Sequence, residues 1–266
     1  MCGIVGILGK SDVAHDIVDA LRRLEYRGYD SAGVATVVGS SLARRRAQGK
    51  LRNLEARLLE EPLAGHTGIG HTRWATHGKP TEVNAHPHMN ERVSVVHNGI
   101  IENYRALRDD LVAKGAAFES DTDTETVVHL ITYYMNGGAS QLEAIQKSLK
   151  RLTGAFALGM IFSDDHDLMV AARKGSPLAI GHGDGEVYLG SDAIALAPFT
   201  TQMTYLDEGD YALLRRDSVV IYDKDGNEVE RPRVQAVAGA LTVDKGNHRH
   251  FMHKEIHEQP EVVSHT

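Results

Sequence analysis

The first half of the chain alternates between short apolar runs and segments in which apolar residues recur every three or four positions. Short apolar runs between turn residues are typical of buried strands, and the longer spacing is typical of helices that pack on one side. We therefore expect strands over residues 4–8, 34–38 and 93–96 and around Ile69. We expect helices at three places: one capped by Ser11 with Val13, Ile17, Ala20, Leu21 and Leu24 on one face, one with Leu51, Leu54 and Leu58, and one with Tyr104, Leu107 and Leu111 that Gly115 closes.

The second half of the chain begins with signals for helix starts. Two pairs of residues have the spacing of a capping box, in which a hydroxyl and a carboxylate bind backbone N–H groups at a helix N-terminus: Thr122 with Glu125, and Ser140 with Glu143. From residue 155 to residue 229 the pattern changes to short strands separated by turn residues. Asp225-Gly226 within this stretch predicts a hairpin turn.

The order of these elements favours one class of fold. Helices and strands are mixed without the regular alternation that builds a parallel sheet, and hairpin-linked strands favour antiparallel pairing. We therefore predict an α+β layered fold in which helices cover antiparallel sheets. The periodicity is lost over residues 231–247, which we expect to be a linker, and residues 248–259 are again helical in character up to Pro260.

The composition excludes several classes of protein. The chain has 266 residues and a formal net charge of −7, so it is not a globally basic nucleic-acid binder. Its single cysteine excludes an internal disulfide, and no apolar run approaches the ~18 residues of a membrane span. The first residues lack the basic and long apolar regions of a signal peptide. We therefore expect a cytoplasmic globular protein with no membrane or nucleic-acid partner.

The single cysteine is also the second residue of the chain. Removal of Met1 would place a thiol and a free α-amine on Cys2, and an α-amine with an ordinary pKa of about 7.7–8.0 is partly neutral at pH 7. A thiol beside such a base is an activated nucleophile. Position alone also allows a simpler interpretation, in which Cys2 is a small buried apolar residue.

Residues 71–78 gather several polar side chains in the sequence His-Thr-Arg-Trp-Ala-Thr-His-Gly. Arginine makes planar, two-pronged contacts with carboxylates, so Arg73 would suit the α-carboxylate of an amino acid. Trp74 is the only tryptophan of the chain and could cover a small ligand. The alternative is an ordinary surface loop in which Arg73 makes an ion pair.

Two further motifs suggest how an amide substrate would be held. Asn98-Gly99 is a hairpin signal, but a helical segment follows it, so its side-chain amide and glycine N–H could instead form an oxyanion hole. Asp123 could bind a substrate ammonium, or it could simply be an acidic residue that favours a helix N-terminus.

Histidines near the C-terminus raise the question of a metal. His250, His253 and His257 share one face of the predicted helix, a spacing that can bind a metal. No cysteine or tight acidic cluster accompanies them, and His86 and His88 are an equally weak signal. No phosphate-binding or dinucleotide-binding motif occurs. We therefore predict neither a metal nor a cofactor.

Taken together, the motifs resemble those of a known enzyme family, the class II glutamine amidotransferases, which are N-terminal-nucleophile hydrolases. The resemblance rests on six segments that follow the family order: residues 1–6, 26–33, 71–78, 84–88, 97–103 and 122–125. It implies a four-layer αββα sandwich of the N-terminal-nucleophile hydrolase type, and a glutaminase domain over residues 2–230.

The resemblance also implies a role for each site residue. Cys2, freed of Met1, would be the nucleophile and its amine the base, with Asn98 and Gly99 as the oxyanion hole. Arg73 would bind the α-carboxylate of glutamine and Asp123 its α-ammonium. The remaining roles are implied in the same way: Thr76 and His77 near the substrate, Trp74 in gating ammonia, and Arg27 and Gly28 in orienting the N-terminus.

The strongest resemblance is to the branch of the family that makes hexosamine phosphates. In that branch the ammonia passes to fructose 6-phosphate, which yields glucosamine 6-phosphate on a sugar-phosphate isomerase domain. Residues 248–266 would be the start of such a domain, and the full-length enzyme would be a homodimer. Two alternatives stay open: the glutaminase domain of another class II amidotransferase, or a non-catalytic module that binds an amino acid or a metal.

Overall fold

Two antiparallel sheets form the centre of the molecule. The computed structural model describes residues 2–236 together with residues 253, 256, 257 and 259. The first sheet has the strand order β15 (Arg233–Gln235), β11 (Gln202–Tyr205), β9 (Ala179–His182), β10 (Val187–Gly190), β1 (Gly3–Leu8), β4 (Thr67–Arg73), β2 (Ser31–Val38) and β3 (Ser41–Gln48). The second has the order β14 (Glu228–Val229), β13 (Val219–Tyr222), β12 (Tyr211–Leu214), β8 (Asp165–Lys174), β7 (Gly154–Phe162), β6 (Val93–Ile101) and β5 (His88–Met89).

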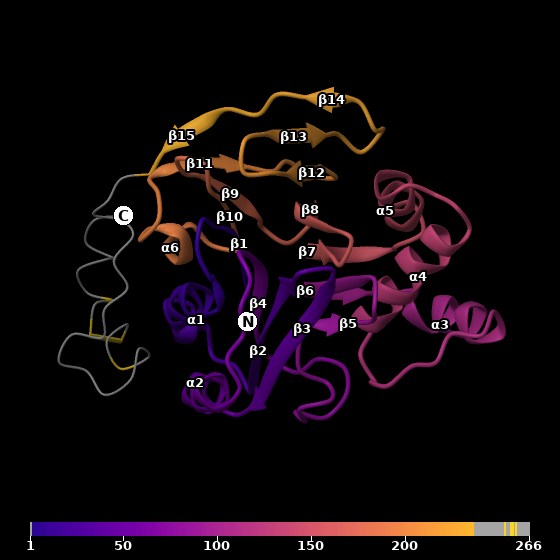
Figure 1. Cartoon of the computed structure of the whole chain (residues 1–266), viewed down its shortest axis with the longest axis horizontal. Coiled ribbons are helices and arrows are strands. Elements are labelled where there is room, and N and C mark those ends of the chain that lie inside the picture. The colour runs from indigo at the N-terminus through magenta and orange to yellow at the C-terminus, as the bar shows by residue number, and fades with distance from the viewer. Residues whose placement is uncertain (1, 237–252, 254–255, 258, 260–266) are drawn as a thin grey trace.

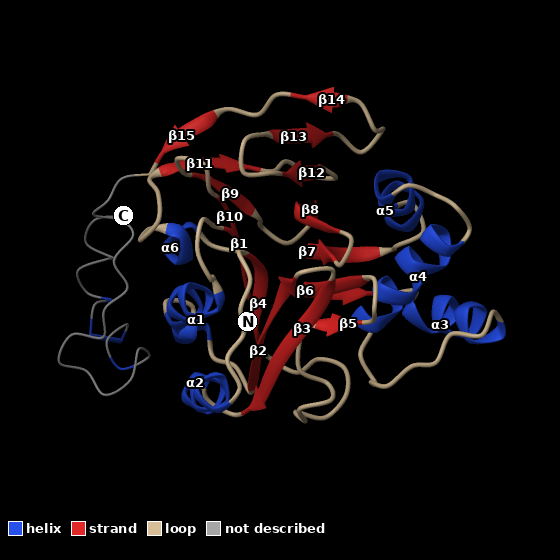
Figure 2. Ribbon diagram, in the orientation of Figure 1, coloured by secondary structure: helices blue, strands red, loops and turns tan. Residues whose placement is uncertain are grey.

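Helices cover the outer face of each sheet (Figure 1, Figure 2). The first sheet carries α1 (Ala14–Arg22), α2 (Leu51–Glu60) and the short α6 (Ala193–Leu196). The second sheet carries α3 (Tyr104–Ala113), α4 (Thr124–Asn136) and α5 (Gln141–Leu149). A single 3₁₀ turn, η1 (Glu25–Arg27), leads from α1 toward β2. None of the helices among the described residues is long and apolar enough to cross a membrane.

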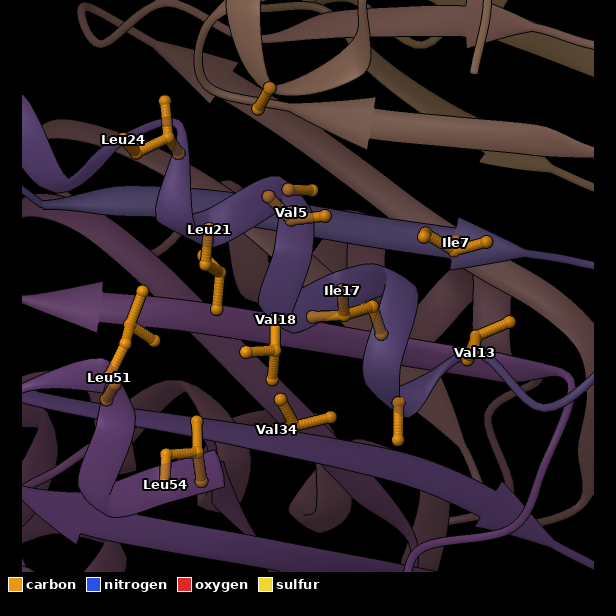
Figure 3. Close-up of a cluster of buried hydrophobic side chains, with 14 of the residues drawn as sticks. Val5, Ile7, Val13, Ile17, Val18, Leu21, Leu24, Val34, Leu51 and Leu54 are labelled. Atoms are coloured by element: carbon orange, nitrogen blue, oxygen red, sulfur yellow. The ribbon is translucent and has the colours of Figure 1, made fainter. Parts of the chain in front are cut away.

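Three separate apolar clusters account for the layers. On β1, Val5 and Ile7 point toward α1, whereas Ile4 and Leu8 point the other way, because successive side chains of a strand face opposite sides of the sheet. The outer cluster beneath α1 and α2 is drawn in Figure 3. A second outer cluster lies beneath α3, α4 and α5, and the third lies between the two sheets. The predicted four-layer αββα sandwich is therefore confirmed.

Most of the expected elements are present, but two helix starts differ from the prediction. Ser11 does not cap α1: the N-cap is Val13, without a side-chain hydrogen bond. Thr122 and Glu125 do not form a capping box either, because the Glu125 carboxylate instead accepts hydrogen bonds from the backbone of Glu119 and Ser120. The Thr122 hydroxyl lies 3.0 Å from His88 Nε2, a tertiary partner that the local spacing does not reveal.

Two other local predictions, at α5 and at the turn between β13 and β14, agree with the structure. Ser140 and Glu143 form a complete capping box at α5. Asp225-Gly226 lies in the turn between β13 and β14, where Gly226 has a φ of +91°. The predicted linker over residues 231–247 begins with a strand, since β15 pairs with β11. The rest of that linker, and most of the helix predicted over residues 248–259, lie outside the described residues, of which 253, 256, 257 and 259 have helical backbone.

Candidate active site

The N-terminal cysteine lies at one end of β1, beside the end of β4. The neighbouring Gly3 pairs with Thr72 of β4, which brings Cys2 next to the loop after Arg73. The Trp74 backbone N–H donates a hydrogen bond to Cys2 Sγ over 3.2 Å. The pocket at this position brings together most of the residues that the sequence singled out: Cys2, Arg73, Trp74, Thr76, His77, Gly99 and Asp123, with His86, His97, Thr122 and Thr124.

Two opposing influences act on the Cys2 thiol. Burial raises its pKa above the ordinary value, because a thiolate is poorly solvated there. The Trp74 hydrogen bond and the positive charge of Arg73 lower the pKa, although by less than burial raises it. The thiol is therefore protonated at neutral pH, and it needs a base if it is to act as a nucleophile.

A buried pair of opposite charges lies in the same pocket. Arg73 is 3% exposed, and its guanidinium donates to the carbonyls of the loop that follows, including those of His77 and Gly78. Asp123 is 4% exposed and accepts a hydrogen bond from the Ile101 N–H over 2.8 Å. An amino acid carries one carboxylate and one ammonium, so this pair is complementary to its two charged groups.

Asn98 and Gly99 approach the same place from β6 of the second sheet. Asn98 Nδ2 donates to the Cys2 carbonyl oxygen over 3.3 Å, and Asn98 Oδ1 lies 3.0 Å from His71 Nε2. Gly99 has a φ of +118°, and a Cβ there would overlap the Ala155 carbonyl oxygen, so only glycine fits. The Asn98 amide nitrogen thus contacts the backbone of Cys2, and Gly99 lines the same pocket as Cys2, so both are candidate donors for an oxyanion hole. Asn98 is not itself among the residues that line the pocket.

Trp74 and the turn after η1 flank the pocket. Trp74 is 54% exposed, and a Cβ on Gly28 would lie 3.0 Å from its ring. Gly28 also has a φ of +73°, which favours glycine. The Arg27 guanidinium forms an ion pair with Asp192 at 2.5 Å, and neither Arg27 nor Gly28 lines the pocket.

Thr76 and His77 belong to the loop between β4 and β5. Thr76 is exposed at the pocket. The His77 ring packs edge-to-face on Tyr104 of α3, with ring centroids 5.1 Å apart. The Arg73 side chain binds the His77 carbonyl, so the guanidinium fixes the loop that carries both residues.

Sequence reasoning missed a layer of buried histidines beneath the pocket. His86 Nε2 and His97 Nδ1 both lie within 3 Å of the Thr124 hydroxyl, at 2.8 and 2.9 Å. His88 Nε2 lies 3.0 Å from the Thr122 hydroxyl, and the His71 and His86 rings are 4.3 Å apart. The signal in the sequence is the His-Pro-His motif at residues 86–88, which by itself indicates only a weak metal site.

Burial dominates the charge state of these histidines. Desolvation lowers the pKa of both His71 and His88 to about 3 and also lowers the pKa of His86 and His97. All four rings are therefore neutral at physiological pH and act as single donors and acceptors.

The described residues do not form a metal-binding cluster. Among residues 2–236, 253, 256, 257 and 259 there is no group of three or more histidine, cysteine or acidic residues placed to hold a metal ion. His253 Nε2 and His257 Nε2 lie 3.1 Å apart, whereas His250 is outside the described residues. The prediction that no metal or cofactor is bound stays a prediction.

Comparison with known proteins gives consistent findings. The family described as a glutamine amidotransferase domain matches residues 71–198. The whole chain is 65% identical to a glutamine–fructose-6-phosphate aminotransferase (isomerizing) of Mesorhizobium japonicum and 63% identical to one of Bradyrhizobium diazoefficiens. In both cases the chain spans 44% of the relative's length.

Solved structures show the same fold. The glutamine phosphoribosylpyrophosphate amidotransferase from B. subtilis aligns with a TM-score of 0.74 at 24% identity, over 85% of this chain and 50% of that one. A structure described as the allosteric regulatory enzyme of purine biosynthesis aligns with a TM-score of 0.73 at 26% identity, over the same shares.

Proposed function

The chain belongs to the class II glutamine amidotransferases, and on this premise we propose that it hydrolyses the side-chain amide of glutamine with Cys2 as the nucleophile. The observation that carries the proposal is one pocket that holds a thiol, a buried cation and a buried anion. Cys2, Arg73 and Asp123 all line it. A zwitterionic amino acid held by both charges would present its side chain to the thiol.

The first half of the reaction forms a thioester. With Met1 removed, the Cys2 amine takes the thiol proton, and the sulfur attacks the Cδ carbonyl of glutamine. The negative charge that develops on the carbonyl oxygen would be stabilised by Asn98 Nδ2 and the Gly99 N–H, and removing one such donor typically costs about 3–4 kcal/mol of activation free energy. The amine then returns its proton to the departing nitrogen. Ammonia leaves, and a γ-glutamyl thioester remains on Cys2.

The second half of the reaction restores the enzyme. The same amine takes a proton from a water molecule, which attacks the thioester carbonyl. The carbon–sulfur bond breaks, glutamate leaves, and the thiol regains its proton. One glutamine and one water thus give one glutamate and one ammonia. The steps use the Cys2 thiol and amine, the two oxyanion-hole donors and one water molecule.

The remaining site residues receive supporting roles in the proposal. Thr76 and His77 lie on the loop that Arg73 fixes and would complete the substrate-binding wall. Trp74 is exposed at the pocket and packs near Gly28, so its ring is placed to control where ammonia goes. Arg27 and Gly28 would hold this turn in place and thereby orient the N-terminus.

The longer relatives suggest where the ammonia goes. They are named for the transfer of nitrogen from glutamine to fructose 6-phosphate, and this chain spans 44% of their length. We propose that in a full-length protein a sugar-phosphate isomerase domain accepts the ammonia and makes glucosamine 6-phosphate. We also propose a cytoplasmic, homodimeric full-length enzyme. The relatives at 59–65% identity all carry this name, which favours it over other class II acceptors.

The proposal is tested by measuring glutamate and ammonia on the same samples of the 266-residue chain. We expect equal amounts of the two products, no effect of a chelator, and no release by Cys2→Ala. Glutaminase activity in Cys2→Ala would exclude Cys2 as the nucleophile. Activity lost with the chelator would instead favour a metal-dependent site.

A further inference from the structure

We propose that His71 is a positioning residue that holds the Asn98 amide in the orientation needed for the oxyanion hole. The inference rests on the proposed function, because it assigns a second residue to the stabilisation of the same oxyanion. The His71 side chain does not line the pocket but lies beneath it.

The His71 side chain connects the two sheets through hydrogen bonds. His71 lies on β4 of the first sheet, two residues after Ile69, and therefore on the face that packs against the second sheet. Its Nε2 atom lies 2.9 Å from the His97 carbonyl oxygen and 3.0 Å from Asn98 Oδ1, both on β6. One ring nitrogen thus bridges the sheets directly below the residue that contacts Cys2.

The donors and acceptors at this contact determine which His71 nitrogen carries the proton and which way the Asn98 amide is oriented. A backbone carbonyl only accepts, so the hydrogen of the neutral His71 ring must be on Nε2, where it is shared with Asn98. The Asn98 atom facing His71 must then also be an acceptor, which is Oδ1. The amide nitrogen is left on the opposite side, where it donates to the Cys2 carbonyl oxygen over 3.3 Å. A reversed amide would place two donors against each other.

The surroundings of the His71 ring allow only one protonation state and one donor atom. His71 is fully buried, and desolvation lowers its pKa to about 3, so the ring is neutral at neutral pH. Its Nδ1 atom is buried and has no hydrogen-bond partner among the described residues. The ring therefore has only one donor, and it points at the Asn98 amide and the adjacent carbonyl.

The experiment compares substitutions that keep or remove the donor. His71→Gln can place an amide N–H near the former Nε2 position, whereas His71→Met has a similar shape without a donor. His71→Asn is polar but too short, because its amide falls near the Nδ1 position. We expect kcat for glutamine hydrolysis to fall at least about 10-fold in the Met and Asn variants and to be largely retained in the Gln variant. KM should change less than about 3-fold in all three.

Two controls separate positioning from damage to the fold. His88→Met removes a neighbouring buried histidine that bonds to Thr122 and not to Asn98, so kcat per folded molecule should be unchanged. Alkylation of Cys2 by iodoacetamide passes through no oxyanion, so its rate should be the same in all the variants. A general loss of structure would instead expose the Cys2 thiol and change the alkylation rate along with kcat.

A double-mutant cycle completes the test. In an Asn98→Ala background, the Gln, Met and Asn variants should have equal kcat, because the group that His71 orients is gone. Equal kcat for the three variants with Asn98 present, or an unchanged difference among them without it, would overturn the inference while leaving the glutaminase intact. If the unmodified chain releases no glutamate, the proposed function fails and the inference fails with it.

Discussion

At the scale of single residues, the buried charges of Arg73 and Asp123 decide what the pocket can bind. Both are shielded from water, so an opposite charge that replaces water there forms a stronger hydrogen bond than it would on the surface. Each also has a partner in the protein: Arg73 the loop carbonyls and Asp123 the Ile101 N–H. The two side chains are therefore already held in place before substrate arrives.

This arrangement predicts the effect of removing the Asp123 charge. Asp123→Asn keeps an oxygen for the Ile101 N–H but loses the attraction for an ammonium, a contribution of roughly 1.5–3 kcal/mol. We expect KM for glutamine to rise about 10- to 100-fold with a much smaller change in kcat, because the ammonium lies far from the reacting amide. Asp121→Asn, which changes a nearby carboxylate outside the pocket, should leave KM as it was. A loss confined to kcat would contradict the binding role of Asp123.

A second prediction concerns the backbone at Gly99. Gly99→Ala would combine a φ of +118° with a Cβ that overlaps the Ala155 carbonyl, so β6 must shift and move the oxyanion-hole N–H. We expect a loss of more than about 3 kcal/mol in the free energy of unfolding, measured with urea, together with a large fall in kcat. Gly115→Ala has a φ of +94° but open space around its Cβ, and it should cost only about 1–2 kcal/mol without affecting kcat.

Individual site residues were predictable from the sequence to very different degrees. Cys2, Arg73 and Gly99 carry visible signals: an N-terminal thiol, a lone arginine in a polar motif, and an Asn-Gly pair that no strand follows. His71 was seen only as part of that polar motif. Its partner on β6 is 27 residues away, and contacts between sheets leave no local periodicity.

At the scale of elements, the helix starts show how tertiary partners override local rules. Ser140 caps α5 with a complete capping box, whereas the N-cap of α4 is Asp123, whose carboxylate accepts the Ile101 N–H instead of capping the helix. Thr122, one residue earlier, bonds to His88. Strand β3 was not expected, since its centre carries Arg44, Arg45 and Arg46 rather than an apolar run. Pairing with β2 along its full length compensates for that composition.

The two serine positions allow a direct comparison. Ser140→Ala removes the hydroxyl that accepts the Glu143 N–H and should lower the free energy of unfolding by about 1 kcal/mol. Ser11→Ala changes an exposed hydroxyl that caps nothing and should have an effect within about 0.5 kcal/mol. Glutaminase activity should be the same in both. Equal losses of stability would mean that the hydrogen bond at α5 contributes nothing.

At the scale of the whole molecule, the histidines between and beside the sheets couple folding to pH. His88 has a pKa of about 3 when folded and about 6.5 when unfolded, so the unfolded chain binds more protons between these values. The stability that comes from a neutral His88 is complete above about pH 6.5 and declines as the pH falls toward 3. The same sign holds for His71.

The size of this effect can be measured by urea unfolding at two pH values. Between about pH 7 and pH 5, each such histidine should contribute a loss of up to about 2 kcal/mol in the free energy of unfolding. His88→Gln cannot gain a proton, so its stability should decline less steeply over that interval than that of the unmodified chain. Identical pH dependence in the two proteins would show that His88 does not stay neutral when folded.

The positions of the proposed site residues also predict which reaction this chain carries out alone. Every residue proposed to hydrolyse or bind glutamine lies between Cys2 and Asp123. We therefore expect the 266-residue chain to release ammonia into solvent, with no stimulation by fructose 6-phosphate and no hexosamine phosphate formed. Parallel measurement of glutamate and hexosamine checks this. Hexosamine formed in step with glutamate would place the acceptor site within the present chain.

The central claim is that a cysteine with its own free amine performs the hydrolysis, and removal of Met1 tests it most directly. Samples that retain Met1 are treated with a methionine aminopeptidase for increasing times, and each sample is divided between intact-mass measurement and a glutaminase assay. We predict that the rate rises in proportion to the fraction of molecules that begin with Cys2, and that it extrapolates to zero when that fraction is zero. Full activity in a sample whose mass still includes Met1 would contradict the account.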